Sequence, residues 1–364
     1  MGLSTMLLLV AVSTALLPLL SLGINPPGSL RDIEKSFVIG VVALGMGTAA
    51  TSRFHHLGIF GFAHLVYLLV VVTIPVLLGG WYVLALIRRR RNRRIKLGAS
   101  VAVLLALLGV WGTHIEPNWL ETDRVALGAR VAQPLIIGVL SDVQTPNVGK
   151  HEWNAVTELL EAEPDMVMVP GDLFQGNTEV ITAAEPGFVE LLQALVAEVE
   201  VVAVVSGDSD RPEQLQSIVA AAGALYIDNQ TMDLQVAGQQ IRLAGVSVWP
   251  SNERLDTLAG LGAPSDGFTI LLSHRPDAVF ELAPGSDVDL VVSGHTHGGQ
   301  ISLPFFGPPV TLSNVPRSLA AGGLGVVDNY AVYVSTGVGL ERGAAPQVRF
   351  GVRPSVGVIE VVPG

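Results

Sequence analysis

The chain has 364 residues, of which 49% are hydrophobic and 15% are charged, and it contains no cysteine. Soluble domains carry about 25% charged residues, so this chain is too apolar to be only a soluble protein. The lack of cysteine excludes disulfide scaffolds, thiolate metal sites and cysteine nucleophiles.

The net charge of −11 is unevenly distributed along the chain. Residues 1–119 hold 10 Lys and Arg against 3 Asp and Glu, whereas residues 120–364 hold 11 against 29. We therefore expect two domains, a basic one over 1–119 and an acidic one over 120–364. No nucleic-acid partner is expected for the acidic domain, because contacts to phosphates need Lys and Arg.

Apolar runs in the first domain predict about four transmembrane helices, since a bilayer core of roughly 30 Å needs about 20 apolar residues of helix. The runs span residues 3–22, 36–52, 60–87 and 97–115. The alternative for the first run is a signal peptide. It lacks a positively charged start and a small-residue cleavage site, so we expect it to remain as an anchor.

A basic stretch from Arg88 to Lys96, with seven positive charges, separates the last two apolar runs. Such stretches stay on the cytoplasmic side of a membrane. We therefore expect a multi-pass protein of the cell (inner) membrane, in contact with the lipid bilayer. Its second domain would face the periplasm or the exterior.

The second domain alternates short apolar runs with amphipathic stretches, which is typical of an α/β fold. We expect strands over 135–140, 165–169, 201–205, 232–236, 241–246, 268–272, 288–292, 330–335 and 356–362. Helices are expected over 153–161, 188–199 and 211–222. Alternation followed by a run of strands predicts mixed sheets packed between helices.

Polar side chains follow five of the expected buried strands. They are Asp142 and Gln144, then Asp172, Asp208, His274, and finally His295 and His297. In open α/β sheets, ligands bind in the crevice beyond the carboxyl ends of the strands. Carboxylate, amide and imidazole groups without sulfur suit Mn, Mg, Fe, Zn or Ni. The pattern therefore predicts a metal site shared by these strand ends.

The motifs resemble those of the calcineurin-like metallophosphoesterases. The matching segments are Asp142-Val143-Gln144, Gly171-Asp172, Gly207-Asp208-Ser209-Asp210, His274 and Gly294-His295-Thr296-His297. The later runs AVYVSTGVG and VRFGVRPSVGVIEV look like those of a membrane-anchored, multi-pass subgroup. The resemblance covers residues 134–364 and implies a sandwich of two mixed β-sheets flanked by helices.

The resemblance also implies a pair of divalent metal ions that activate water to attack a phosphoester. Carried over by position, Asp172 would bridge the ions, and it would act in catalysis with Asp208 and His295. One ion would be held by Asp142, Gln144, Asp172 and His297. The other would be held by Asp172, Asp208, His274 and His295.

Three positions depart from the family pattern. Gln144 and Ser209 replace histidines, and Asp208 replaces an asparagine. The histidine absent at Ser209 is the one that protonates the leaving group or stabilises the transition state. General acid catalysis contributes about 10²–10⁴-fold, so this is the most serious loss. His151 is a candidate substitute, and Arg275 a candidate ligand for the substrate phosphate.

Two functions remain open at this stage. The first is a membrane-bound phosphoesterase that hydrolyses a phosphomonoester or phosphodiester, with a lipid or an envelope precursor as the candidate substrate. The second is a catalytically impaired domain that serves as a membrane-anchored binding or sensing protein. Asp210 is expected to be a turn residue or a support for the metal ligands. Phe305 and Phe306 are expected either to touch lipid or to pack in the core.

Overall fold

A computed structural model describes residues 58–89 and 93–364 of the chain. The first two expected transmembrane segments, 3–22 and 36–52, lie outside the described residues. The chain divides into two units. One holds the residues up to Ile115 together with Glu341–Gln347, and the other holds Glu116–Leu340 and Val348–Gly364.

The first unit contains a helix that runs from Gly58 to Ile87 and is apolar enough to cross a membrane. It consists of α3 (Gly58–Leu68), a wide turn η1 (Leu69–Thr73) and α4 (Ile74–Ile87). The wide turn directly precedes Pro75, which lacks a backbone donor and disrupts the regular hydrogen-bond ladder. Thirty residues span about 45 Å at ~1.5 Å per residue, which exceeds a bilayer core.

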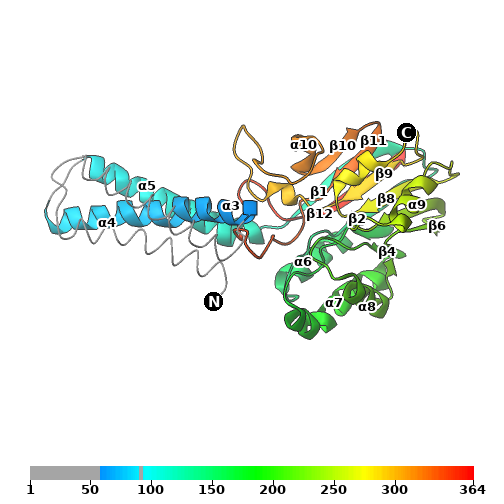
Figure 1. The fold of residues 1–364 in the computed structure, drawn as a ribbon, viewed down its shortest axis with the longest axis horizontal. Helices are drawn as coiled ribbons and strands as arrows, with labels where there is room; N and C mark the ends of the chain where they lie inside the picture. Colours follow the sequence, from blue (N-terminus) through cyan, green and yellow to red (C-terminus); the bar gives the residue numbers. More distant parts are fainter. Residues whose placement is uncertain (1–57, 90–92) are drawn as a thin grey trace. The chain divides into compact units, whose positions relative to one another are not determined.

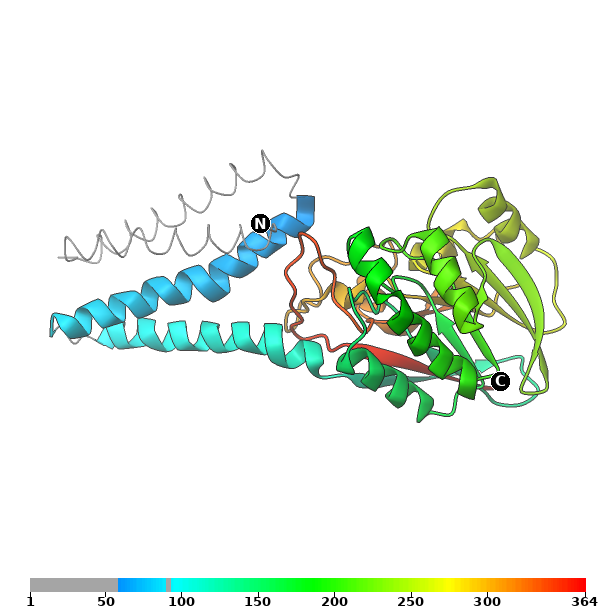
Figure 2. The ribbon, with the colours of Figure 1, turned by 90° about the horizontal axis from the view of Figure 1, so that it is seen from below.

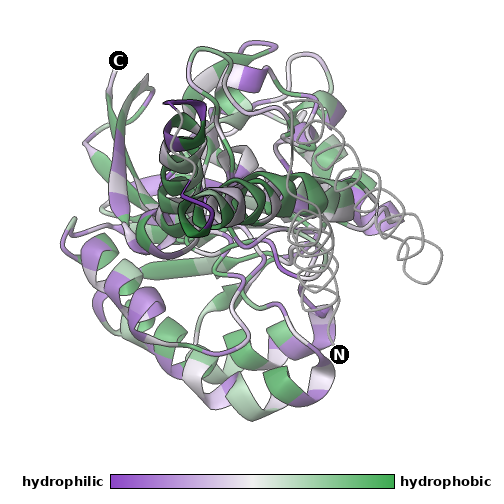
Figure 3. Cartoon of the chain, turned by 90° about the vertical axis from the view of Figure 1, so that its left-hand side faces the viewer, coloured by the Kyte–Doolittle hydropathy of each residue, from purple (hydrophilic) through white to green (hydrophobic). Residues whose placement is uncertain are grey.

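A second candidate membrane helix runs from Arg93 to Asn118. It begins as α5 (Arg93–Val110) and continues through η2 (Trp111–Ile115) and η3 (Glu116–Asn118). Gly109 lies against Val71, where a Cβ atom would come within 2.9 Å of the valine Cβ. Small residues let membrane helices approach closely in this way. Figure 3 shows the hydrophobic residues that dominate these helices in green.

The second unit contains two six-stranded sheets, and the first of them is mostly parallel. Its order is β1 (Glu121–Ala129), β12 (Ser355–Pro363), β2 (Leu135–Val139), β3 (Met166–Val169), β4 (Val201–Val204) and β5 (Leu225–Tyr226). The neighbours from β2 to β5 pair in parallel, while β12 runs antiparallel to β2. The carboxyl ends of β2, β3 and β4 therefore meet at one edge.

Three helices cover one face of this sheet: α6 (Lys150–Leu160), α7 (Thr178–Glu198) and α8 (Pro212–Ala222). Figure 1 and Figure 2 show them together in green. Each begins at a defined signal, such as the Asn177 side chain that accepts from the Val180 amide, or Pro212 in the first turn of α8. Although α7 is also long and apolar, it packs Phe188 and Leu191 into the core of this unit.

The second sheet has the order β10 (Gly323–Val327), β11 (Tyr330–Val334), β9 (Leu290–Ser293), β8 (Phe268–Ser273), β7 (Gln239–Val246) and β6 (Gln230–Val236). Its inner strands β7, β8, β9 and β11 pair in parallel. The shorter elements α9 (Asn252–Gly260), η4 (Pro276–Glu281), η5 (His297–Gly299) and α10 (Arg317–Ala320) follow its strands.

The two sheets pack face to face, and the alternation of side chains along each strand sets the layers. In β3, Met166 and Met168 lie in the core between the sheets, whereas Val167 and Val169 face the helices. Fully burying such a side chain contributes roughly 1.5–3 kcal/mol. The predicted fold class, two mixed sheets flanked by helices and preceded by apolar helices, is confirmed.

Three strands were not expected from the sequence: β1, the two-residue β5, and β10. The segment 121–129, for which no element was predicted, forms β1, an edge strand that pairs in parallel with β12 over nine residues. Its charged residues Glu121, Asp123 and Arg124 lie at a half-exposed edge, so the segment lacks the apolar run of a buried strand. Strand β10 is likewise a half-exposed edge strand, hairpin-paired with β11.

Candidate metal centre

The candidate ligand side chains lie directly after the carboxyl ends of five strands from both sheets. Asp142 and Gln144 follow β2, Asp172 follows β3, and Asp208 follows β4. From the second sheet, His274 follows β8, and His295 and His297 follow β9. The sandwich therefore brings polar groups from 156 residues of chain, Asp142 to His297, to one edge.

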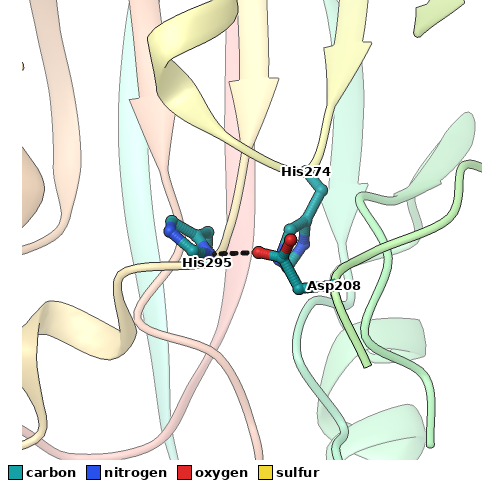
Figure 4. Close-up of side chains that lie close together, drawn as sticks. All are labelled: Asp208, His274 and His295. Carbon is teal, nitrogen blue, oxygen red and sulfur yellow. Dashed lines mark ion pairs between the residues drawn. The ribbon is translucent and has the colours of Figure 1, made fainter. Parts of the chain in front are cut away.

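One cluster consists of Asp208, His274 and His295, whose potential ligand atoms all lie within 4.8 Å of one another. Asp208 Oδ2 is 3.0 Å from His295 Nδ1 and 3.4 Å from His274 Nε2. Figure 4 shows the Asp208 carboxylate pointing toward the His295 ring, with the ion pair drawn as a dashed line. One carboxylate oxygen and two imidazole nitrogens converging in this way match the donor set of a divalent transition metal.

A second cluster consists of Asp142, Asp172 and His274, with ligand atoms again within 4.8 Å of one another. His274 Nε2 is 3.6 Å from Asp172 Oδ2. His297 Nε2 adds a fourth group, 3.5 Å from Asp142 Oδ1. The two clusters share His274, so they form one continuous centre.

Hydrogen bonds at the far side of His274 orient it for metal binding. Its Nδ1 lies 2.8 Å from the carbonyl oxygen of Pro170, so Nδ1 carries the proton and donates. Nε2 is then the atom that would offer its lone pair to a cation. Among the described residues it is buried without a hydrogen-bond partner, as is Nδ1 of His297. Metal-ligating histidines characteristically donate their other N–H to a carbonyl or carboxylate. These residues therefore fit a bound cation.

The charges at the centre also favour a bound cation. Burial raises the pKa of Asp142 to about 6. Burial alone would lower the pKa of His274, but Asp172, Asp208 and Asp142 outweigh it and raise that pKa to about 10. The concentration of buried carboxylates thus favours positive charge at this point, and a divalent cation would supply it.

Backbone strain is concentrated at the same residues. Asp142, Gln144, Asp172, His295 and His297 all have positive φ, between 39° and 72°. Residues other than glycine adopt this region rarely, at a cost of order 1–3 kcal/mol each. The surrounding structure must stabilise all five residues in this strained conformation. Clusters of strained residues are typical of functional sites.

Asp210 fixes the loops that carry two of the candidate ligands. Its buried carboxylate accepts hydrogen bonds from the amides of Asp172 (2.7 Å), Leu173 (2.9 Å), Phe174 (3.3 Å) and Gly207 (2.9 Å). The loops come so close that a Cβ on Gly171, which has φ +87°, would collide with the backbone at Gly207. Asp210 therefore supports the loops that carry the ligands, which is the second of the two roles expected for it.

Arg349 is a further support, and its role was not expected from the sequence. The side chain is fully buried and its guanidinium donates to the carbonyl oxygens of Thr336 (2.9 Å), Gly337 (2.9 Å) and Gly339. That loop in turn donates from the Gly339 amide to Asp142 O at 2.7 Å. Burial, with a contribution from the Arg349 charge, lowers the pKa of His297 well below its usual value and keeps the ring neutral.

The three residues that depart from the family pattern, Gln144, Asp208 and Ser209, all lie at the centre. Gln144 Nε2 donates to Asp172 Oδ2 at 2.8 Å, so the amide nitrogen faces the bridging candidate. The Ser209 amide donates to Asp172 Oδ1 at 2.7 Å, while its hydroxyl donates to the Phe174 carbonyl oxygen at 2.8 Å. Its side chain is therefore engaged with backbone and offers no acid to a leaving group.

The two candidate substrate residues differ in position. Arg275 donates to both oxygens of Asp208, from Nε at 3.1 Å and from its Nη2 atom. It also lines a cavity of about 480 Å³, together with residues of the loop before α9 and of η4. His151 Nε2 lies 3.0 Å from the carbonyl oxygen of Val338, which is a backbone contact.

Comparisons with known proteins agree with this geometry. Residues 135–299 match the family model of the calcineurin-like phosphoesterases. Phosphodiesterase YaeI of Escherichia coli (strain K12) is 26% identical, over 74% of this chain and 99% of that protein. The transmembrane protein with metallophosphoesterase domain of Danio rerio is 27% identical, over 68% of this chain and 58% of that protein.

Among solved structures, a dimetal phosphatase from Danio rerio is similar at 14% sequence identity and a TM-score of 0.33. The similarity covers 56% of this chain and 88% of that chain.

Proposed function

We propose that this chain is a membrane-bound, metal-dependent phosphoric ester hydrolase, and the match of residues 135–299 to the family model of the calcineurin-like phosphoesterases supports this. The observation that carries the proposal is the convergence of Asp208, His274 and His295 within 4.8 Å, beside the second cluster of Asp142, Asp172 and His274. When bound, a pair of divalent ions at such a site activates the phosphoester and water for in-line attack.

The residues divide into two ligand groups in this proposal. Asp142, Gln144, Asp172 and His297 hold one ion, and Asp172, Asp208, His274 and His295 hold the other. Asp172 suits the shared position because its Oδ2 faces His274, with both oxygens aligned by hydrogen bonds from Gln144 and the Ser209 amide. Gln144 joins the set by presenting its amide oxygen, which requires the amide to turn from its present hydrogen bond.

Arg275 positions the substrate in this proposal. Its guanidinium now donates to both oxygens of Asp208, and the residue also lines the 480 Å³ cavity. The same fork of donors suits a phosphate oxygen pair. The cavity is lined by polar groups such as Asn252, Asp277 and Glu281 as well as by apolar ones. The group esterified to the phosphate would lie there, beside Arg275.

The apolar helices of the chain also bear on which substrate we propose. Besides α7, which packs in the core of the second unit, two described helices are long and apolar enough to span a bilayer. The seven positive charges from Arg88 to Lys96 favour the cytoplasmic side, and this supports a periplasmic or exterior position for the second unit. A hydrolase tethered there favours a phosphoester of a lipid or an envelope precursor.

Hydrolysis of a chromogenic phosphodiester tests the proposal. The purified full chain should release p-nitrophenol from bis-p-nitrophenyl phosphate when Mn²⁺ is added, because the donor set suits that ion. A chelator should abolish the release, and Mn²⁺ should restore it. Absence of turnover on phosphomonoesters and phosphodiesters with every divalent metal would refute the hydrolase. It would favour the second candidate, a membrane-anchored binding or sensing protein, for which the engaged Ser209 hydroxyl is the supporting observation.

A further inference from the structure

The loop after the candidate ligands His295 and His297 ends in an exposed apolar tip, formed by Leu303, Pro304, Phe305 and Phe306. Phe305 is fully exposed and Phe306 is 58% exposed. Phenylalanine is among the residues most often buried. Two exposed neighbouring phenylalanines form an apolar patch of the kind that marks an interaction site. Core packing, one of the two expectations for these residues, is therefore wrong.

The tip is held outward by a closed turn. Leu303 and Gly307 exchange two backbone hydrogen bonds, at 3.0 and 2.9 Å. Phe305 occupies the turn with φ 66°, a conformation in which a bulky residue is uncommon. The base of the loop is tied down where the Ser302 amide donates to Phe350 O at 2.7 Å. The hydrogen bonds of the loop therefore hold the two phenylalanines in exposed positions.

We propose that this apolar tip inserts into the surface of the lipid bilayer. The same chain contains helices that are long and apolar enough to span a bilayer, and the second unit is covalently joined to them. Aromatic residues prefer the boundary between water and lipid. The Arg317 guanidinium stacks over the Phe306 ring at 5.0 Å and is exposed, which places a positive charge beside the tip for lipid phosphates.

The tip is connected to the candidate centre through its own loop. Pro308, two residues after Phe306, packs so closely on Gly299 that a Cβ there would collide with it. Further along, the carbonyl oxygen of Leu312 lies 3.3 Å from His295 Nε2. Insertion of the tip would therefore hold the metal-ligand loop close to the membrane surface. This inference goes beyond the proposed hydrolysis and does not require it.

Single-cysteine labelling tests the insertion, because the chain has no cysteine of its own. The full chain with Phe305→Cys is labelled with an environment-sensitive fluorophore in nanodiscs of phosphatidylethanolamine and phosphatidylglycerol. We expect blue-shifted emission, quenching by doxyl-labelled lipid and loss of quenching by iodide. The matched control is Val326→Cys, an exposed apolar residue of β10 that is 70% exposed, and its label should respond to iodide and not to doxyl lipid.

Equal behaviour of the two labels, in water or in lipid, would overturn the proposal. Protection of the Phe305 label from iodide without quenching by doxyl lipid would also overturn it, because the partner would then be protein, such as a second copy of this chain. Both readouts are independent of hydrolysis, so an inactive enzyme would not affect them.

Discussion

Asp172→Asn should reduce metal-dependent hydrolysis of bis-p-nitrophenyl phosphate by about 10²–10³-fold or more, the range seen when one preorganised electrostatic group is removed. Both carboxylate oxygens are in use, since Oδ1 accepts from the Ser209 amide and Oδ2 from Gln144 Nε2. An asparagine must direct its amide nitrogen at one of these two donors. It also removes the negative charge expected to bridge two cations.

The matched control for Asp172→Asn is Glu190→Gln, which removes a carboxylate from an exposed position of α7 and should leave the rate unchanged. Thermal unfolding of both variants separates a lost site from a lost fold. If Asp172→Asn folds normally and retains the full rate, the assignment of Asp172 to the centre is wrong.

Ser209→His should increase the hydrolysis of phosphodiesters with poor leaving groups by about 10²-fold, the lower end of what a general acid contributes. The Ser209 hydroxyl donates to the Phe174 carbonyl oxygen, so the present chain has no acid at this position. The Ser209 amide, which donates to Asp172, is retained in the variant. Esters of p-nitrophenol need little protonation and should gain much less than esters of phenol or of an alkyl alcohol.

The comparison of leaving groups is what makes the Ser209→His prediction specific. A gain of equal size for good and poor leaving groups would mean that the variant changes binding or metal affinity instead of proton transfer. Ser209→Ala serves as the control, and it should show the same dependence on the leaving group as the native chain. No gain on any ester would contradict the inference that an acid is missing at residue 209.

Much of the fold was predictable because buried strands and the polar residues after them are local patterns. The run before Asp142 and the run before Asp172 each read as a buried strand, and both form one. In contrast, β1 depends on pairing with β12, more than 200 residues later in the chain. No local pattern of 121–129 contains that information, because an edge strand with charged residues resembles a loop.

The residues that position the loops of the centre, Asp210 and Arg349, were less predictable than its candidate ligands. The four amide hydrogen bonds of Asp210 come from two loops that meet only in the folded sheet. The full burial of Arg349 was unexpected because an arginine is almost never fully buried without a partner. Here the partners are the carbonyl oxygens of Thr336, Gly337 and Gly339, and no sequence pattern marks these backbone atoms as its partners. The sequence signal was the run VRFGVRPSVGVIEV, noted as a resemblance with no role attached.

The number of divalent ions bound to the purified full chain tests the proposed centre most directly. After incubation with Mn²⁺ and removal of free metal, elemental analysis should find two ions per chain, because the two clusters of ligand atoms share His274 and adjoin one another. Asp172→Asn should retain fewer. A native chain that holds one ion or none would contradict the dinuclear centre.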